Sequence, residues 1–247
     1  MKTVLITGCS SGFGLEIARH FLERDWNVIA TMRQPAADLL PASPRLRLLP
    51  LDVTDPDSIA RAVAAAGPID VLVNNAGVGM LGALEGTAMS TARSVFETNT
   101  LGTIALTQAV LPGFRSRQSG VIVNVTSSVT LLPLPLLSVY TASKAAVNAF
   151  TESVALELAQ FNVRCHLVLP GRSPETRFGE NARSHMEGAI PEAYADFAKG
   201  VFEGRGQSAD VTHAADVAEA VWRAATDPAA PMRIPAGADA VAVAGQM

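Results

Sequence analysis

A tyrosine and a lysine four residues apart are the strongest candidates for chemistry in this sequence. Tyr140 and Lys144 would share one face of a helix, because positions i and i+4 are neighbours there. A phenol with a pKa of about 10 is a weak base at neutral pH, and a fixed cation beside it favours the phenolate. The pair therefore suits reversible proton transfer to an alkoxide. Since Tyr-x-x-x-Lys also occurs by chance on ordinary helix surfaces, its place in the fold has to support this interpretation.

A glycine-rich turn follows the first apolar segment. Gly8, Gly12 and Gly14 have the spacing G-x-x-x-G-x-G, and a helical pattern continues from Leu15. Glycines let the backbone approach a pyrophosphate, and the start of a helix presents free N–H groups to it. The spacing differs from the commoner G-x-G-x-x-G. The turn therefore indicates a dinucleotide site, with a tight turn that binds no ligand as the alternative.

The end of the second predicted strand bears on the choice of dinucleotide. Folds that bind NAD(H) usually carry an acid about twenty residues after the glycines, where it accepts hydrogen bonds from the ribose. Here Met32 and Arg33 stand at that place, so the acid is missing and a cation is present. We therefore expect NADP(H), with Arg33 and the hydroxyl of Ser11 at the 2′-phosphate. A surface arginine without a ligand is the alternative.

The elements that must position these residues alternate along the chain. Short apolar runs and longer helical stretches follow one another, the pattern of a parallel sheet covered on both faces. We predict one α/β domain over residues 1–247, a doubly wound parallel sheet in three layers. The expected strands are 3–7, 27–31, 46–51, 69–74, 119–126, 163–169 and 232–234. The expected helices lie near 13–25, 56–65, 90–113, 138–161 and 212–226.

Residues 172–210 interrupt this alternation. They have mixed charge, five glycines and weak apolar periodicity. A long insertion between regular elements is usually a binding loop or a lid. We expect this segment to bind substrate and to close over it, and a surface excursion without function is the alternative.

Composition narrows the classes of protein. Hydrophobic residues make up 49% of the chain and charged residues 17%, as in a globular protein, and the net charge of -4 offers no basic surface for nucleic acid. The two cysteines cannot form a disulfide framework, and the four histidines lack metal-ligand spacing. No apolar run reaches the ~18–20 residues of a membrane span. We expect a cytoplasmic protein with a small-molecule substrate, no metal and no membrane partner.

Several motifs in one order resemble the short-chain dehydrogenase/reductase family over nearly the whole chain. Thr7-Gly8-x-x-x-Gly12-x-Gly14 is similar to its cofactor turn, and Leu51-Asp52-Val53 to the segment that meets adenine. Asn74-Asn75-Ala76-Gly77 is similar to its motif along the cofactor, and Pro170-Gly171 to the segment beside the nicotinamide. The resemblance assigns these positions to the cofactor: Gly8, Ser10, Ser11, Gly12, Phe13, Gly14, Arg33, Asp52, Val53, Asn75, Ala76, Gly77, Tyr140, Lys144, Pro170, Gly171 and Ser173.

The same resemblance implies four catalytic residues. Ser127 lies thirteen residues before Tyr140, the spacing of the family, which favours it over the hydroxyls on either side. Tyr140 would exchange a proton with the substrate oxygen, and Ser127 would donate a hydrogen bond to that oxygen. Lys144 would bind the nicotinamide ribose and lower the pKa of Tyr140. Asn99 would hold a water that links Lys144 to solvent.

Two positions depart from the family pattern. Thr130 replaces the glycine that is common after the serine motif. The threonine of the usual Pro-Gly-x-x-x-Thr is displaced, so either Ser173 or Thr176 would contact the carboxamide. The sequence leaves that choice open.

Substrate and assembly are less readable. In the family that this chain resembles, the loop at 131–137 lines the substrate side of the site, and its leucines here imply a hydrophobic ketone or secondary alcohol. These leucines could instead pack under the loop or in a subunit contact. Arginines in the following insertion could meet an acidic group. Helix 138–161 has an apolar surface wider than packing against a sheet requires. The family resemblance implies that this helix and helix 90–113 form subunit contacts, so we expect a homodimer or homotetramer. A non-catalytic protein that senses NADP(H) is the alternative function.

Overall fold

The computed structural model describes residues 1–176, 182, 186, 188–205 and 210–246. Within them, seven parallel strands form one sheet in the order β3-β2-β1-β4-β5-β6-β7. The strands are β1 (Thr3–Thr7), β2 (Asn27–Met32), β3 (Leu46–Pro50), β4 (Val71–Asn74), β5 (Gly120–Val125), β6 (Val163–Pro170) and β7 (Arg233–Ala236). The doubly wound parallel sheet predicted from the alternating pattern is confirmed.

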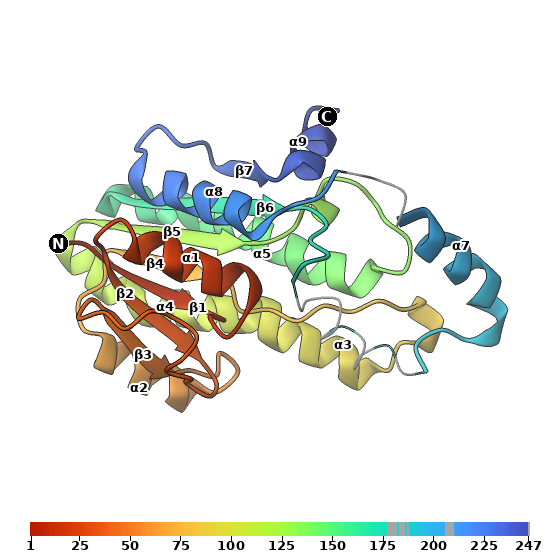
Figure 1. Ribbon diagram of the computed structural model, residues 1–247, viewed down its shortest axis with the longest axis horizontal. Coiled ribbons are helices and arrows are strands. Elements are labelled where there is room, and N and C mark those ends of the chain that lie inside the picture. The colour runs from red at the N-terminus through yellow and green to blue at the C-terminus, as the bar shows by residue number, and fades with distance from the viewer. Residues whose placement is uncertain (177–181, 183–185, 187, 206–209, 247) are drawn as a thin grey trace.

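Helices cover both faces of the sheet and make three layers (Figure 1). α1 (Gly12–Leu22) and α8 (Ala214–Thr226) pack on one face, and α2 (Pro56–Ala66), α4 (Gly102–Arg117) and α5 (Ser138–Leu158) pack on the other. The strands between them read as continuous apolar runs because they are buried from both sides. All six residues of β5, for example, are buried.

Local signals set the ends of α2. The Asp55 side chain accepts a hydrogen bond from the backbone N–H of Asp57 at 2.9 Å, which caps the helix start. Pro56 occupies the first turn, where its missing N–H costs nothing. At the other end Gly67 takes φ 72°, a conformation that a side chain disfavours. These contacts explain why the predicted helix 56–65 is found within one residue.

The predicted helix near 90–113 is three elements instead of one. α3 (Met89–Phe96) passes into a π-helical turn, η2 (Glu97–Leu101), and then into α4. A π-turn inserts extra backbone into a helix and often marks a functional site. The predicted helical stretch is therefore found, and the sequence missed only the π-helical turn within it.

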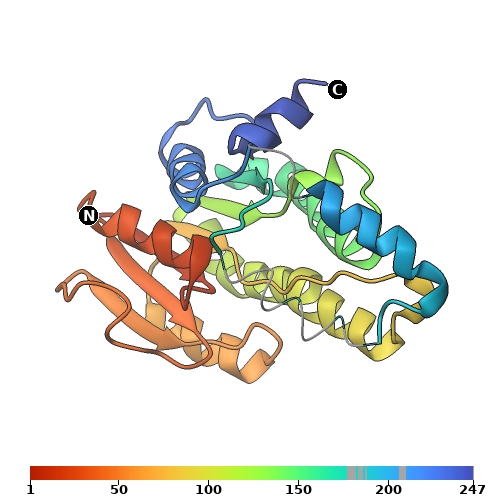
Figure 2. The same cartoon turned by 45° about the vertical axis from the view of Figure 1, so that its right-hand side comes forward.

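Among the helices given above and below for the described residues, α7 and α9 were not predicted. α7 (Ala195–Arg205) lies inside the segment 172–210 and packs Ala198 against Leu136 and Ala83. Its weak amphipathicity hides it in the sequence. α7 lies at the end of the molecule away from the N-terminus (Figures 1 and 2). α9 (Ala238–Ala244) is seven residues long and lies beside β7 at the C-terminal end (Figure 1).

The expectation that residues 172–210 close over substrate falls partly on positions outside the described residues, namely 177–181, 183–185, 187 and 206–209. The closing motion therefore stays a prediction. What the structure does describe of the segment is its beginning at 172–176 and the helix α7.

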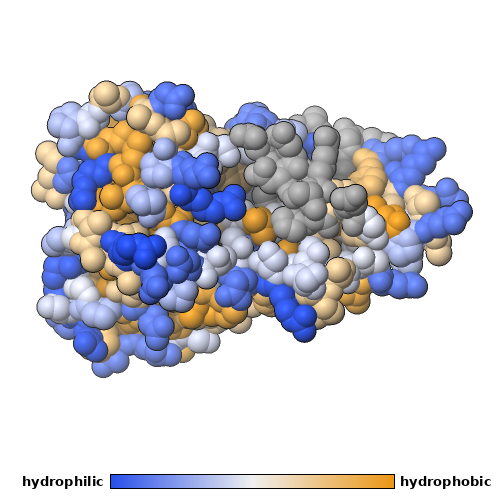
Figure 3. Space-filling view, turned by 90° about the horizontal axis from the view of Figure 1, so that it is seen from below, coloured by the Kyte–Doolittle hydropathy of each residue, from blue (hydrophilic) through white to orange (hydrophobic). Residues whose placement is uncertain are grey.

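The surface mixes residue types. On the face seen from below, hydrophilic residues lie between the apolar ones (Figure 3). Within the described residues, none of the helices combines the length and apolar character needed to cross a bilayer. The more exposed large apolar side chains include Leu84, Met89, Leu156 and Phe197.

Candidate active site

A cleft of about 560 Å³ opens at the carboxyl ends of β1, β2 and β4. The strand order reverses between β1 and β4, which is where open α/β sheets bind their ligands. Eleven residues assigned to the cofactor from the sequence line this cleft: Gly8, Ser10, Ser11, Gly12, Phe13, Arg33, Asp52, Val53, Asn75, Ala76 and Gly77. Sequence reasoning missed other lining residues, among them Thr54, Val78, Ser94 and Thr98.

The glycine turn leaves room along the floor of the cleft. Gly8 and Gly12 have φ of 73° and 56°, and a Cβ on Gly8 would lie 2.9 Å from the Cα of Ala76. Gly14 differs from them, because it is buried and does not line the cleft. A Cβ there would overlap the carbonyl oxygen of Gly8, so Gly14 serves the packing of α1 against the turn.

The start of α1 suits a phosphate group. Ser11 is the N-cap residue, yet its side chain makes no capping hydrogen bond, and the first turn contains no acid. The first backbone N–H groups of a helix lack intrahelical partners and carry partial positive charge. In the glycine-lined cleft these donors, with the hydroxyls of Ser10 and Ser11, form a cradle that fits a dinucleotide pyrophosphate.

Arg33 lies where the sequence placed it, directly after β2. Arg33 is exposed and lines the cleft. Met32 also lines the cleft, but only 3% of it is exposed. Hydrogen bonds from the backbone and hydroxyl of Thr54 lower the pKa of Asp52, and the positive charge of Arg33 lowers it further. Arg33 is therefore close enough to act on charge in this part of the cleft.

The two asparagines at the end of β4 fix the shape of the cleft. The side-chain amide of Asn75 donates to the carbonyl of Thr7 at 2.9 Å, which ties the end of β4 to the glycine turn. Asn74 is buried and donates to the side chain of Asn124 on β5 at 2.8 Å. Asn75 thus lines the cleft while also fixing its shape.

Ser127 and Tyr140 form a buried pair. Tyr140 comes from the first turn of α5, and Ser127 follows β5; their side chains are hydrogen-bonded. Burial raises the pKa of the Tyr140 phenol, and the bond to Ser127 opposes that rise. Tyr140 therefore carries its proton at neutral pH and can give it to a substrate oxygen.

Lys144 lies one turn further along α5. Its ammonium donates to the carbonyl of Val125 at 3.1 Å, and burial lowers its pKa to about 8. A Cβ on Gly77 would lie 3.3 Å from its Nζ, so the ammonium borders the inner end of the cleft. Burial and Ser127 are the influences on the Tyr140 pKa in this structure. The lowering of that pKa by Lys144 stays a prediction.

Asn99 sits in the π-turn. Its side chain accepts from the backbone N–H of Val78 at 2.8 Å and donates to the carbonyl of Val78 and to Ser143 at 3.0 and 3.1 Å. It is 1% exposed, and a Cβ on Gly77 would lie 3.1 Å from its Oδ1. The turn therefore brings Asn99 beside Lys144 and fastens it to the segment after β4.

Ser173 and Thr176 occupy different places in the loop after β6. Thr176 lines the cleft, and a Cβ added to Gly12 would lie 3.4 Å from the Cβ of Thr176. Ser173, like Pro170 and Gly171, lies outside the cleft lining. Its hydroxyl is buried without a hydrogen-bond partner among the described residues. The structure therefore places Thr176 against the glycine turn, and which of the two residues contacts the carboxamide stays a prediction.

The apolar side of the site surrounds Tyr140. Met80, Val95 and Leu137 form a buried cluster with its ring. Leu136 packs instead beneath α7, and Leu132 and Leu134 are exposed. The leucines of this run therefore have different surroundings. Leu137 contacts the Tyr140 ring, Leu136 packs against α7, and Leu132 and Leu134 face solvent.

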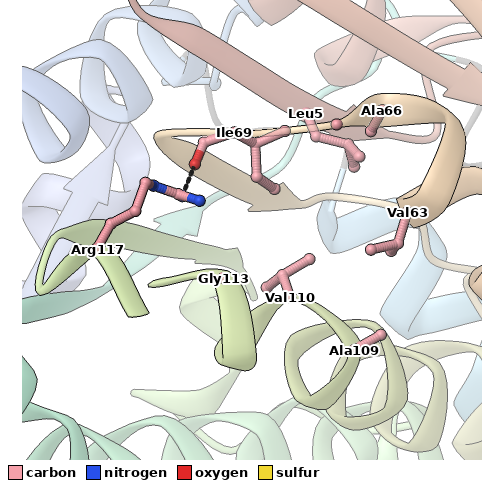
Figure 4. Close-up of a pocket in the computed structure, with 9 residues that line it drawn as sticks. Leu5, Val63, Ala66, Ile69, Ala109, Val110, Gly113 and Arg117 are labelled. Atoms are coloured by element: carbon pink, nitrogen blue, oxygen red, sulfur yellow. Dashed lines mark hydrogen bonds between the residues drawn. The ribbon is translucent and has the colours of Figure 1, made fainter. Parts of the chain in front are cut away.

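A second hollow lies at the opposite end of β4. Its volume is about 80 Å³, and Leu5, Val63, Val110 and Arg117 are among the residues around it (Figure 4). The guanidinium of Arg117 donates to the carbonyl of Ile69 at its edge. Ligand sites for small molecules are usually ~300 Å³ or more, so this hollow is too small for a dinucleotide.

Comparison with known proteins agrees with this geometry. The family model described as short chain dehydrogenase matches residues 2–187. Human retinol dehydrogenase 8 is 42% identical over 181 residues, 69% of this chain and 58% of the relative, so the match spans little more than half of that protein.

Solved structures extend the similarity to nearly the whole chain. A short-chain dehydrogenase from Streptomyces avermitilis is 34% identical with a TM-score of 0.84, covering 99% of this chain and 91% of that one. A short chain dehydrogenase from Burkholderia cenocepacia, solved with NADP, is 27% identical with a TM-score of 0.79, covering 99% and 93%. Another structure of this fold contains NAD.

Proposed function

Since this chain belongs to the short chain dehydrogenase family, we propose that it transfers a hydride between NADP(H) and a carbonyl or secondary alcohol. The observation that carries the proposal is the buried, hydrogen-bonded pair of Ser127 and Tyr140, one helical turn from Lys144, whose ammonium lies beside Gly77 in the lining of the dinucleotide cleft. A protein that only senses NADP(H) has no need of this set.

The side chains divide the work of the reaction. The nicotinamide supplies or accepts the hydride. In reduction Tyr140 donates its proton to the substrate oxygen, and in oxidation it accepts that proton back. Ser127 donates a hydrogen bond to the same oxygen, where charge develops. Lys144 binds the ribose through its ammonium, and Asn99 holds a water that connects Lys144 with solvent.

The cofactor fits the cleft through its phosphates. The glycine floor and the uncapped start of α1 suit the pyrophosphate. Arg33 suits a 2′-phosphate, because a guanidinium can grip a phosphate with two donors. Solved structures of this fold contain NADP or NAD, so the preference for NADP(H) rests on Arg33 and on the absence of an acid at position 32.

The substrate we propose is a hydrophobic ketone or alcohol. Met80, Val95 and Leu137 present apolar surface around the ring of Tyr140. Burying apolar area is worth about 25 cal/mol per Å², which favours a substrate with a hydrocarbon body. Similarity to a retinol dehydrogenase supports the same class.

We also propose that the protein is a homodimer or homotetramer in a reducing compartment such as the cytoplasm. Leu156 on α5 is 82% exposed, as expected of a helix that meets a second copy. Cys9 and Cys165 are buried free thiols, which a reducing compartment preserves.

The oxidation of NADPH with a panel of ketones, aldehydes and quinones tests the activity. We expect turnover with at least one apolar carbonyl compound, and the loss of NADPH absorbance measures its rate. The Tyr140→Phe variant, run on the same panel, separates enzymatic from background oxidation. Tight binding of NADPH without turnover of any compound would favour the sensing protein instead.

The pH dependence of reduction should report on Lys144. Its folded-state pKa is lowered to about 8, so the ammonium is charged below that pH and loses its charge above it. We expect kcat/KM for reduction to fall as the pH rises through about 8, because the neutral amine holds the ribose less well. Lys144→Arg keeps its charge, so any residual activity should lack this fall. A wild-type profile that stays level through this region would contradict the role of Lys144.

A further inference from the structure

We infer that Asp239, in the first turn of α9, positions the loop after β6 that closes one side of the cofactor cleft. This inference rests on the proposed function, because it concerns how the cleft is held ready for NADP(H). Asp239 lies 52 residues beyond the part of the chain matched by the family model, which ends at residue 187. Its two carboxylate oxygens make separate contacts with the loop and with the segment that returns from it.

The first contact is with the loop itself. Asp239 Oδ2 accepts a hydrogen bond from the backbone N–H of Arg172 at 2.6 Å. A Cβ on Gly171 would overlap the carboxylate of Asp239. Asp239 fills the space beside Gly171, whose contact with the cofactor stays a prediction. Glycine is needed here so that the carboxylate can reach the backbone.

The second contact is with Thr212, which is fully buried. The Thr212 hydroxyl accepts from the backbone N–H of Gly171 at 2.8 Å. Its single proton faces two acceptors, Asp239 Oδ1 at 2.7 Å and the carbonyl of Ala236 at 2.9 Å. The backbone N–H of Thr212 donates to the carbonyl of Arg172, also at 2.8 Å. The two ends of the insertion are therefore joined at Arg172 and Thr212, and Asp239 bonds to both.

Gly237 allows α9 to reach this junction. It has φ 94°, and a Cβ there would overlap the hydroxyl of Thr212. α9 therefore begins close enough to Thr212 for Asp239 to span the gap. The whole arrangement depends on two glycines that lie far apart in the sequence.

The junction acts on the cleft through a short stretch of backbone. Four residues after Arg172, Thr176 packs against Gly12 and lines the cleft. On the other side, the carbonyl of Pro170 is 3.5 Å from the hydroxyl of Ser127. Asp239 touches neither the cleft nor the reacting groups. It is a positioning residue whose effect falls first on cofactor binding.

Asp239→Ala tests the inference through NADPH binding, measured by the fluorescence of the nucleotide. We expect the dissociation constant to rise roughly tenfold, since a hydrogen bond to a charged group is lost. The value of kcat at saturating NADPH should change much less. In the protein without cofactor, the amide of Arg172 should exchange its hydrogen faster.

Matched variants separate positioning from general destabilisation. Asp57→Ala makes the same change in the first turn of α2, at an exposed position far from the loop, and should leave binding and exchange unchanged. Asp239→Asn keeps an acceptor for Arg172 and should restore most of the binding.

If Asp239→Ala does not fold, variants of Thr212 test the same inference. NADPH binding should weaken in Thr212→Val, which lacks the hydroxyl, and should be retained in Thr212→Ser, which keeps it.

A double-variant cycle gives the sharpest test. Gly171→Ala should harm binding in the wild-type background because its methyl meets the carboxylate. In the Asp239→Ala background the same change should be tolerated better, so the two effects should not add. Unchanged NADPH binding and unchanged Arg172 exchange in Asp239→Ala would overturn the inference. A wild-type protein that binds no NADPH would overturn the proposed function instead, and the exchange experiment would still test the contact.

Discussion

The Tyr140→Phe variant should lose turnover by roughly 10²–10⁴-fold while its affinity for NADPH stays close to that of the wild type. Phenylalanine keeps the ring that packs with Met80, Val95 and Leu137. It removes the hydroxyl that is bonded to Ser127 and that would give its proton to the substrate. Steady-state kcat under chemistry-limited conditions, together with a binding titration, measures both quantities.

The chain offers a close control for this experiment. It contains two tyrosines, and Tyr194→Phe makes the same change in the short turn Glu192–Tyr194. That variant leaves Tyr140 and Ser127 in place, so its kcat at saturating substrate should stay near normal even where KM changes. If Tyr140→Phe retained more than about a tenth of the wild-type kcat, the assignment of the proton donor would be wrong.

The second large effect concerns the choice between NADPH and NADH. The wild type should bind NADPH about ten- to hundredfold more tightly, because a charge-assisted contact is worth about 1.5–3 kcal/mol. Arg33→Ala should remove most of this preference by weakening NADPH binding alone. Met32→Asp combined with Arg33→Ala should reverse it, since the new carboxylate repels the 2′-phosphate and accepts from ribose hydroxyls.

The structure shapes the design of that experiment. Met32 lines the cleft but is only 3% exposed, so an aspartate there has to reach the cleft to avoid burying its charge. A thermal melt of each variant therefore accompanies the binding titrations. Arg61→Ala removes an exposed arginine on α2 and serves as the control for net charge. Equal dissociation constants for NADH and NADPH in the wild type would refute the preference and leave the catalytic assignment standing.

Local interactions explain why so much of the frame could be predicted. The strands are buried apolar runs, and the cap of α2 is made by residues within two positions of each other. Tyr140 and Lys144 share a helix face because they are four residues apart. Each of these features involves residues only a few positions apart, so the order of residue types in the sequence is enough to predict it.

The π-turn at Asn99 shows where a local pattern misleads. The stretch from Met89 to Arg117 is helical throughout, but its turn at Asn99 is π-helical, and Asn99 bonds to Val78, 21 residues earlier. That bond and the one from Asn99 to Ser143, 44 residues later, hold the turn in place. A tertiary contact thus decided the backbone at a catalytic candidate.

The sequence by itself determined the residues able to do chemistry, the glycine turn, the missing acid after β2 and the alternation that makes a parallel sheet. Tertiary structure decided which distant groups meet. It joined Ser127 to Tyr140, placed Thr176 instead of Ser173 in the cleft, and set Asp239 beside Gly171. The physical reason is that the crossovers of a parallel sheet bring together residues tens of positions apart, and side-chain volume then selects the contacts that fit.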